Sequence, residues 1–371
     1  MLNNTLLINK YIESLNNGEI KKVLFKDKFN FHMAKTSLET LLNIEILIDE
    51  YLKDTKVKNN NGDKIILLFG ILQGLFVGID SIYTIGKATG LNKLMINLNQ
   101  HESLREIKNI RNDVVGHPTY RYYENNSVGY CTLDLDHIED SKITYFIHTY
   151  ENNKIVIKKR QVDLINSIND YHTELDEILT RTIKFNEVLL SKEKTNLSRL
   201  ISSLGEKFIR GIYDENLLED IRVKYSKLFN LPKSANNRVI WRLNLIDYLF
   251  NFHDKNEYTR YLTYSEIHKL YLLVFNFENK VNNKLKYKFI KYKNNQEFKY
   301  LRSQLLRLKD INFKLDILHD SRHPLYNSSI KLLISRFKSD TRCSDLINWI
   351  ESQVNQSNDS MLYLIGSELK K

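Results

Sequence analysis

The chain has 371 residues, of which 42% are hydrophobic, and a formal net charge of +10 from 55 Lys and Arg against 45 Asp and Glu. This apolar fraction excludes an intrinsically disordered chain, and only 3 Pro and 12 Gly disfavour an architecture of many tight turns. Two cysteines cannot form a disulfide framework or a four-thiolate zinc site, and the first residues lack a secretory signal pattern. We therefore expect a mostly helical, cytoplasmic protein.

Three helices are the first predicted elements. Apolar residues recur at helical spacing over residues 31–52, 64–87 and 91–117, and Pro118 ends the third helix because its ring disfavours helix at the residue before it. Within the second helix, the apolar run 65–79 is broken by Gln73 and is shorter than the roughly 20 residues that a bilayer span needs. It predicts a buried helix and no membrane association.

A small β insertion is predicted before the fourth helix. Residues 128–159 contain the short β-branched and aromatic runs VGYCTLDL, KITYFIHTY and KIVIKK, separated by polar residues. These runs indicate a β-hairpin or meander. Residues 162–190 then resume the helical period and close a four-helix bundle.

The charge divides the chain near residue 194. Residues 1–193 hold 24 basic and 26 acidic residues, a net charge of −2, whereas residues 194–371 hold 31 and 19, a net charge of +12. We expect two domains: 1–194, the helical bundle with its β insertion, and 195–371, a basic α-helical domain. The helices predicted in the second domain are 197–213, 217–229, 237–252, 265–277, 296–318, 328–338 and 344–353. Its charge favours an anionic partner such as nucleic acid, although a biased genome composition would produce the same enrichment.

The segment RNDVVGHP, residues 111–118, ends the third predicted helix. Arg111 is followed by the polar Asn112, and His117 stands six positions after Arg111. An Arg with a His at about this spacing should occur about once by chance in a chain of this composition. The pattern gains meaning from its position at the end of a bundle helix.

In that context the chain resembles the HEPN superfamily, whose members carry an Arg-polar-x-x-x-x-His motif at the end of a helix in a four- or five-helix bundle. QGLFVGID (73–80) and LREIKNI (104–110) are also similar to the helices that precede this motif, and the resemblance covers residues 30–190. It implies a HEPN-like bundle that acts as a metal-independent endoribonuclease without a cofactor, with Arg111 and His117 as the catalytic pair and Asn112 as an auxiliary polar residue. It further implies a homodimer that serves as a toxin or an antiphage effector in abortive infection. A neutralising antitoxin or a defence-system protein is then a candidate partner.

These residue types suit the reaction. Metal-free cleavage of RNA needs a group that moves protons near neutral pH and a fixed cation for the phosphate charge, which His and Arg provide. On an ideal helix, however, Arg111 and His117 would be about 9 Å apart in height and about 120° apart in azimuth. A compact site therefore requires either local unwinding near Gly116 or a second copy of the motif from another subunit.

The motif residues also have purely structural interpretations. Arg111 would be a surface helix residue if it paired with a carboxylate such as Glu106 or Asp113. His117 would be a helix cap if it interacted with the last carbonyl groups.

Other polar residues are weaker candidates. Asp80 follows the apolar run of the second helix and would orient His117 or Arg111 if it faced the site. Tyr120 and Arg121 would contact a base or a phosphate, or lie in a solvated loop. The pair His319 and His323 suggests a second site, but a polar turn before Pro324 explains it equally.

Residues 280–309 form the most basic segment, with ten Lys and Arg against one acid, Glu297. Aromatic residues are interleaved with the basic ones, and this combination holds single-stranded nucleic acid by neutralising phosphates and stacking bases. The candidate RNA-binding residues are Lys286, Tyr287, Lys288, Lys291, Tyr292 and Lys293. The alternation of Lys with apolar residues is equally typical of an exposed edge strand protected from aggregation.

The sequence thus predicts a metal-independent endoribonuclease that cleaves RNA through its Arg/His motif. The alternative is a non-catalytic helical RNA-binding or adaptor protein that uses the bundle for dimerisation. Cleavage of RNA by the pure protein in EDTA separates the two.

Overall fold

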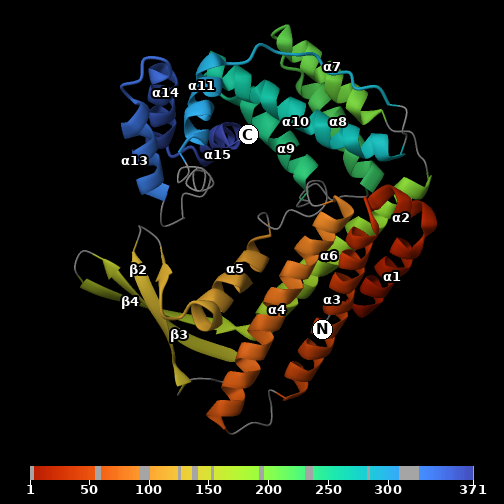
Figure 1. Ribbon diagram of the computed structural model, residues 1–371, viewed down its shortest axis with the longest axis vertical. Helices are drawn as coiled ribbons and strands as arrows, with labels where there is room; N and C mark the ends of the chain where they lie inside the picture. The colour runs from red at the N-terminus through yellow and green to blue at the C-terminus, as the bar shows by residue number, and fades with distance from the viewer. Residues whose placement is uncertain are drawn as a thin grey trace.

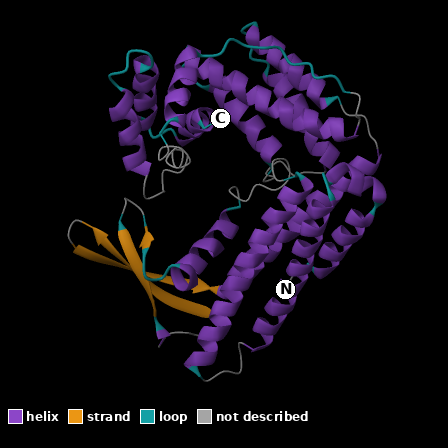
Figure 2. Ribbon diagram, in the orientation of Figure 1, coloured by secondary structure: helices purple, strands orange, loops and turns teal. Residues whose placement is uncertain are grey.

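The computed structural model describes residues 4–54, 60–91, 101–123, 127–135, 141–151, 154–191, 196–229, 237–281, 285–308 and 326–370. The protein is mostly helical and contains one small four-stranded antiparallel sheet (Figures 1 and 2). The prediction of a largely helical chain with a small β insertion is therefore confirmed.

The elements of the first half are α1 (Thr5–Asn16), α2 (Gly18–Leu24), α3 (Lys28–Asp54), α4 (Asn61–Thr89), α5 (Glu102–Arg111), the π-helical turn η2 (Asn112–Gly116), β1 (Arg121–Tyr122), β2 (Val128–Leu133), β3 (Lys142–Glu151), β4 (Lys154–Asp163) and α6 (Leu164–Ser191). Those of the second half are α7 (Leu197–Ile209), α8 (Glu215–Phe229), α9 (Arg238–Asn251), α10 (Glu257–Val281), α11 (Gln296–Leu306), α13 (Tyr326–Phe337), α14 (Ser344–Asn355) and α15 (Asp359–Leu369). The described residues thus contain α1, α2 and α15, which the sequence analysis did not predict, and a longer α10.

The helical bundle of the first half is built around α4. This helix packs against α3, α5 and α6, while α1 packs against α3 and α6 (Figure 1). Leu38, Leu75 and Leu175, from α3, α4 and α6, are fully buried. Among the described helices, α4 alone is long and apolar enough to cross a membrane by length and composition, and half of its most apolar stretch is buried inside the protein.

The sheet has the strand order β1-β2-β3-β4, with every neighbouring pair antiparallel. Residues that face each other across the strands share one face of the sheet. Tyr145 on β3 lies opposite Leu133 on β2 and Arg160 on β4, and this face turns toward α5. The sheet is therefore attached to the helix that carries the motif (Figure 1).

Two apolar cores hold the described residues together. The first extends from α1 to α10, and the second joins α11, α13, α14 and α15 to adjoining ends of α9 and α10. Phe185 of α6 packs against Phe229 of α8 and Phe277 of α10, with ring centroids 6.0 and 5.1 Å apart. The first core thus continues across the domain boundary predicted at residue 194, and that boundary stays a prediction.

Candidate active site at the end of helix α5

Helix α5 does not end as a regular α-helix. Residues Asn112–Gly116 form a π-helical turn, which the backbone N–H of His117 closes by donating to the Asn112 carbonyl oxygen at 2.8 Å. A π turn widens the helix by one residue and is frequent at functional sites. Local unwinding, one of the two arrangements that a compact site requires, is therefore present in the fold.

The Arg111 guanidinium is held from three sides. Its Nε and Nη2 donate to Gln73 Oε1 at 3.0 and 2.9 Å, and its Nη1 donates to Asn112 Oδ1 at 3.1 Å. The ring of Phe76 lies under the guanidinium, with the Arg111 Cζ 4.3 Å from the ring centroid. Gln73 and Phe76 both come from α4, so the bundle itself fixes the position of the cation.

Gly116 makes room for this arrangement. A Cβ atom placed on Gly116 would lie 2.4 Å from Arg111 Nη1, closer than two such atoms can approach. The side chain of any other residue at this position would displace the guanidinium. The glycine of the motif is therefore required by the position of the arginine.

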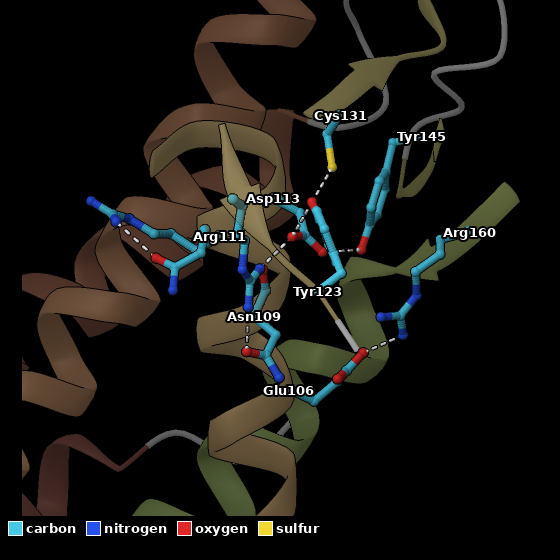
Figure 3. A network of polar contacts seen from close by, with 10 residues as sticks. Glu106, Asn109, Arg111, Asp113, Tyr123, Cys131, Tyr145 and Arg160 are labelled. Carbon is cyan, nitrogen blue, oxygen red and sulfur yellow. Dashed lines mark hydrogen bonds and ion pairs between the residues drawn. The ribbon is translucent and has the colours of Figure 1, made fainter. Parts of the chain in front are cut away.

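Neither of the two carboxylates expected as alternative partners of Arg111 pairs with it. Glu106 forms an ion pair with Arg160 (Figure 3), and Asp113 forms one with Arg121. In the described part of the chain, the hydrogen bonds of Arg111 go to neutral amides only, so its charge is not compensated by an acid. They use three of its five N–H groups and leave two for a ligand.

The other predicted catalytic residues lie differently. Asn112 contacts Arg111, whereas His117 is exposed at the end of the π turn and Asp80 is exposed on α4. No hydrogen bond or ion pair between described residues joins His117 or Asp80 to Arg111. Gln73, two helical turns before Asp80, occupies the place on α4 that the sequence analysis gave to Asp80. The sequence feature that could have identified Gln73 as a site residue is that it is the polar residue that breaks the apolar run 65–79.

Asp113 connects the motif to the sheet. This buried carboxylate accepts hydrogen bonds from the Tyr123 hydroxyl at 3.1 Å and the Tyr145 hydroxyl at 3.3 Å, besides its ion pair with Arg121 (Figure 3). Arg121 also donates to the Asn109 carbonyl oxygen and side chain at 3.1 and 3.0 Å. Arg121 and Asp113 therefore have a structural role, which fixes the sheet to α5.

Burial dominates the titration of this network. It raises the pKa of the Asp113 carboxyl above its ordinary value, although the Arg121 guanidinium opposes the shift. It also raises the pKa of the Cys131 thiol to about 11, and this thiol lies 3.0 Å from the Tyr123 hydroxyl. Cys131 is thus protonated near neutral pH.

The basic segment of the second half has neither helix nor strand over residues 285–295. It is fastened to the helices beneath it: Ser202 donates to the Lys288 carbonyl oxygen at 2.8 Å, and the Lys288 N–H donates to the Tyr271 hydroxyl at 2.9 Å. The ring of Phe289 fills the space over Gly205 on α7, where a Cβ would approach it to 2.9 Å. The segment therefore lies as a strap across α7 and α10.

The lysines of the strap are exposed, and its two candidate tyrosines contact α10. Lys286, Lys288, Lys291 and Lys293 are all exposed. The Tyr292 ring packs against Tyr264 with centroids 4.9 Å apart, and the Tyr287 hydroxyl lies 2.7 Å from His268 Nε2, although Tyr287 is 52% exposed. The predicted phosphate contacts and part of the Tyr287 ring are thus available to a ligand, whereas Tyr292 is engaged with α10.

The remaining predicted site, His319 and His323, lies outside the described residues. No protein-family model, curated protein or solved structure matches this chain.

Proposed function

We propose that the protein is a metal-independent endoribonuclease whose active site is formed by Arg111 and His117. The observation that carries this proposal is the rigidly held Arg111 guanidinium, which retains an uncompensated charge and two unused donors. A cation fixed in this way suits a phosphate, because two parallel N–H groups can bind two phosphate oxygens at once.

In the proposed reaction, the 2′-oxygen of a ribose attacks the adjacent phosphorus and the bond from phosphorus to the 5′-oxygen breaks. The proton of the 2′-hydroxyl must be removed, and the departing 5′-oxygen must receive one. His117 is exposed next to the π turn and carries one of these protons, while Arg111 stabilises the charge that builds up on the phosphate oxygens. The products are a 2′,3′-cyclic phosphate and a 5′-hydroxyl.

One imidazole cannot remove one proton and deliver another at the same moment on opposite sides of the phosphorus. A second His117, from a partner subunit, would supply the missing proton carrier. The chemistry therefore favours a homodimer in which two motifs face one RNA backbone, as the HEPN resemblance also implies. A two-fold axis beside the end of α5 would bring the two copies together.

The strap supplies a second RNA contact in this proposal. Its four exposed lysines would neutralise phosphates outside the active site, a contact that needs no fixed geometry. The assignment to toxins or antiphage effectors, the neutralising partner and the cytoplasmic location follow from the sequence resemblance and composition alone.

The decisive experiment is cleavage of RNA by the purified protein in EDTA. We expect cleavage to persist, and we expect Arg111→Ala, Arg111→Lys and His117→Ala each to lower the rate by at least about 10²-fold. Lysine should not replace Arg111 because it keeps the charge but cannot hold the fork between Gln73 and the phosphate. Mass spectrometry of the products should show the cyclic phosphate.

The matched controls are Arg199→Ala and His32→Ala, which remove the same two residue types at exposed positions on α7 and α3. Both should cleave RNA as the wild type does. Activity abolished by EDTA, or motif variants as active as the controls, would reject the proposal. RNA binding without cleavage would instead favour the non-catalytic adaptor.

A further inference from the structure

One face of the small sheet is covered by exposed rings. The register places Tyr130, His148 and Ile157 side by side across β2, β3 and β4, and places Tyr122, Val128 and Tyr150 side by side across β1, β2 and β3. This face points away from Asp113 and α5, because Tyr145 and Arg160 occupy the alternate positions. We call Tyr122, Tyr130, His148 and Tyr150 the aromatic sheet face.

The three tyrosine rings of this face are exposed although they are large. Tyr122, Tyr130 and Tyr150 are 48%, 41% and 59% exposed. Solitary exposed apolar residues need no explanation, but rings grouped on one face of a sheet indicate an interaction surface.

Two of the rings are already arranged as a stack. Tyr130 and His148 lie almost parallel, with centroids 4.6 Å apart and an angle of 6° between their planes. His148 Nε2 lies 2.9 Å from the Thr132 hydroxyl, which fixes the orientation of the imidazole. A flat ligand that stacks on this pair would lose little side-chain freedom in the protein on binding.

One exposed cation lies beside the rings. Strand β4 forms one edge of the sheet, and Lys159 is exposed on the aromatic sheet face, whereas Lys154 and Lys158 occupy the alternate positions of the strand. Lys159 lies directly across from Phe146, in the row next to that of Tyr130 and His148. Stacking rings with a cation beside them match bases joined by a phosphate.

The face is also fixed relative to the active site. Strand β1 begins four residues after His117, and the Cys131 N–H donates to the Pro118 carbonyl oxygen at 2.6 Å. The ion pair between Arg121 and Asp113 ties the same strand to η2. The aromatic sheet face therefore keeps a fixed position relative to the motif.

We propose that the aromatic sheet face binds the unpaired bases of the single-stranded RNA that the Arg111 and His117 site cleaves. This inference rests on the proposed function and assigns the substrate class: a single strand, because bases that are paired in a duplex cannot stack on side chains. Each accessible ring would take the face of one base, and Lys159 would contact the backbone.

The same rows include Ile155 and Ile157, which are 60% and 58% exposed. Substitutions of these two residues can distinguish the binding of RNA from the binding of a protein partner. Stacking uses the rings and makes little use of the two isoleucines. A protein docked on this face would bury the isoleucines together with the tyrosines. The tyrosine and isoleucine variants should therefore differ if RNA is the ligand.

The test measures binding of a fluorescein-labelled oligouridylate of about 10 nucleotides by anisotropy, in the cleavage-deficient His117→Ala protein. Tyr130→Ala and Tyr150→Ala should each raise the Kd at least about fivefold, the value of about 1 kcal/mol per stacked base. Tyr130→Phe and Tyr150→Phe should restore the affinity because the ring remains. Ile155→Ala and Ile157→Ala should change the Kd by less than about twofold.

Unchanged RNA affinity in both alanine variants would overturn the inference, and so would a larger loss in the isoleucine variants than in the tyrosine variants. A shift from dimer to monomer in light scattering, with unchanged RNA affinity, would assign the face to a second copy of the chain. Because the readout is binding, a failure of the nuclease proposal would appear in the cleavage assay and not in this one.

Discussion

The motif at the end of α5 and the strap over residues 285–295 contain the same kinds of side chain in opposite arrangements. At the motif the cation is fixed: Gln73, Asn112 and Phe76 hold the Arg111 guanidinium. In the strap the cations are exposed, and Tyr292 packs against α10 while Tyr287 contacts α10 and is half exposed. The first arrangement stabilises charge at one defined point, whereas the second provides a field of positive charge over an extended surface.

The role of the motif thus depends on the position of its cation, whereas the role of the strap depends on the number of its cations. Electrostatic stabilisation of a reaction depends on donors that are already in position, so a small displacement of Arg111 should matter as much as its removal. Neutralisation of an RNA backbone depends on the number of cations and little on their exact positions. Substitutions that change only one of the two properties can test each region.

The largest effect is expected from Gly116→Ala, which changes geometry at the motif and leaves every charge in place. The new methyl group would meet Arg111 Nη1, at the flexible end of the side chain, so the guanidinium should move while the fold persists. We expect RNA cleavage to fall by about 10²-fold with little change in the thermal midpoint, measured by circular dichroism.

Gly70→Ala on α4 is the matched control, because a Cβ at Gly70 would meet nothing within 4 Å. It introduces the same methyl group into a helix of the same bundle and should leave cleavage unchanged. If Gly116→Ala cleaves RNA at the wild-type rate, the fixed position of Arg111 is not the source of the activity.

A smaller effect is expected from charge reversal in the strap. Replacing Lys286, Lys288, Lys291 and Lys293 together by Glu should weaken RNA binding about tenfold or more at low salt. It should also reduce the slope of log K against log salt, by up to about 0.7 for each phosphate that the strap no longer neutralises. The same four positions changed to Arg should keep both the affinity and the slope, since the charge is retained.

Exchanging lysine for arginine in the strap should leave RNA binding unchanged, whereas exchanging arginine for lysine at position 111 should lower RNA cleavage. The two exchanges thus separate a role that depends on charge from a role that depends on geometry. A charge-reversed strap that binds RNA with the wild-type affinity and salt dependence would reduce this segment to an ordinary solvated surface. Weaker binding on the exchange of lysine for arginine would show that the strap, like the motif, depends on geometry.

Sequence patterns were sufficient for the elements whose apolar residues recur over many turns. Helices α3, α4 and α6 and the strands β2 and β3 lie where periodicity and β-branched runs placed them. The chain before residue 30 was not assigned, although Ile8, Tyr11 and Leu15 of α1 are buried at helical spacing. Helix α2 follows directly because the Asn17 side chain accepts hydrogen bonds from the N–H groups of Glu19 and Ile20.

The site required contacts that a sequence does not display. The π turn and the position of Arg111 depend on Gln73 and Phe76, which are separated from the motif by more than thirty residues. The engagement of Tyr287 and Tyr292 depends in the same way on His268 and Tyr264 of α10. Local spacing located the motif and the strap, but only tertiary packing decides which of their side chains are fixed and which are exposed.

The smallest expected effect belongs to the test of whether the motif of one chain is sufficient for RNA cleavage. The π turn brings local unwinding to a single chain, whereas the reaction calls for two proton carriers, so the shared site must be tested directly. In an equal mixture of His117→Ala and wild-type subunits that exchange freely, about one quarter of the dimers are wild type on both sides. A site that needs both His117 residues should then retain about one quarter of the wild-type activity. Independent sites should retain about one half, and that result, or an active monomer in light scattering at the assay concentration, would confine the chemistry to the motif of one chain.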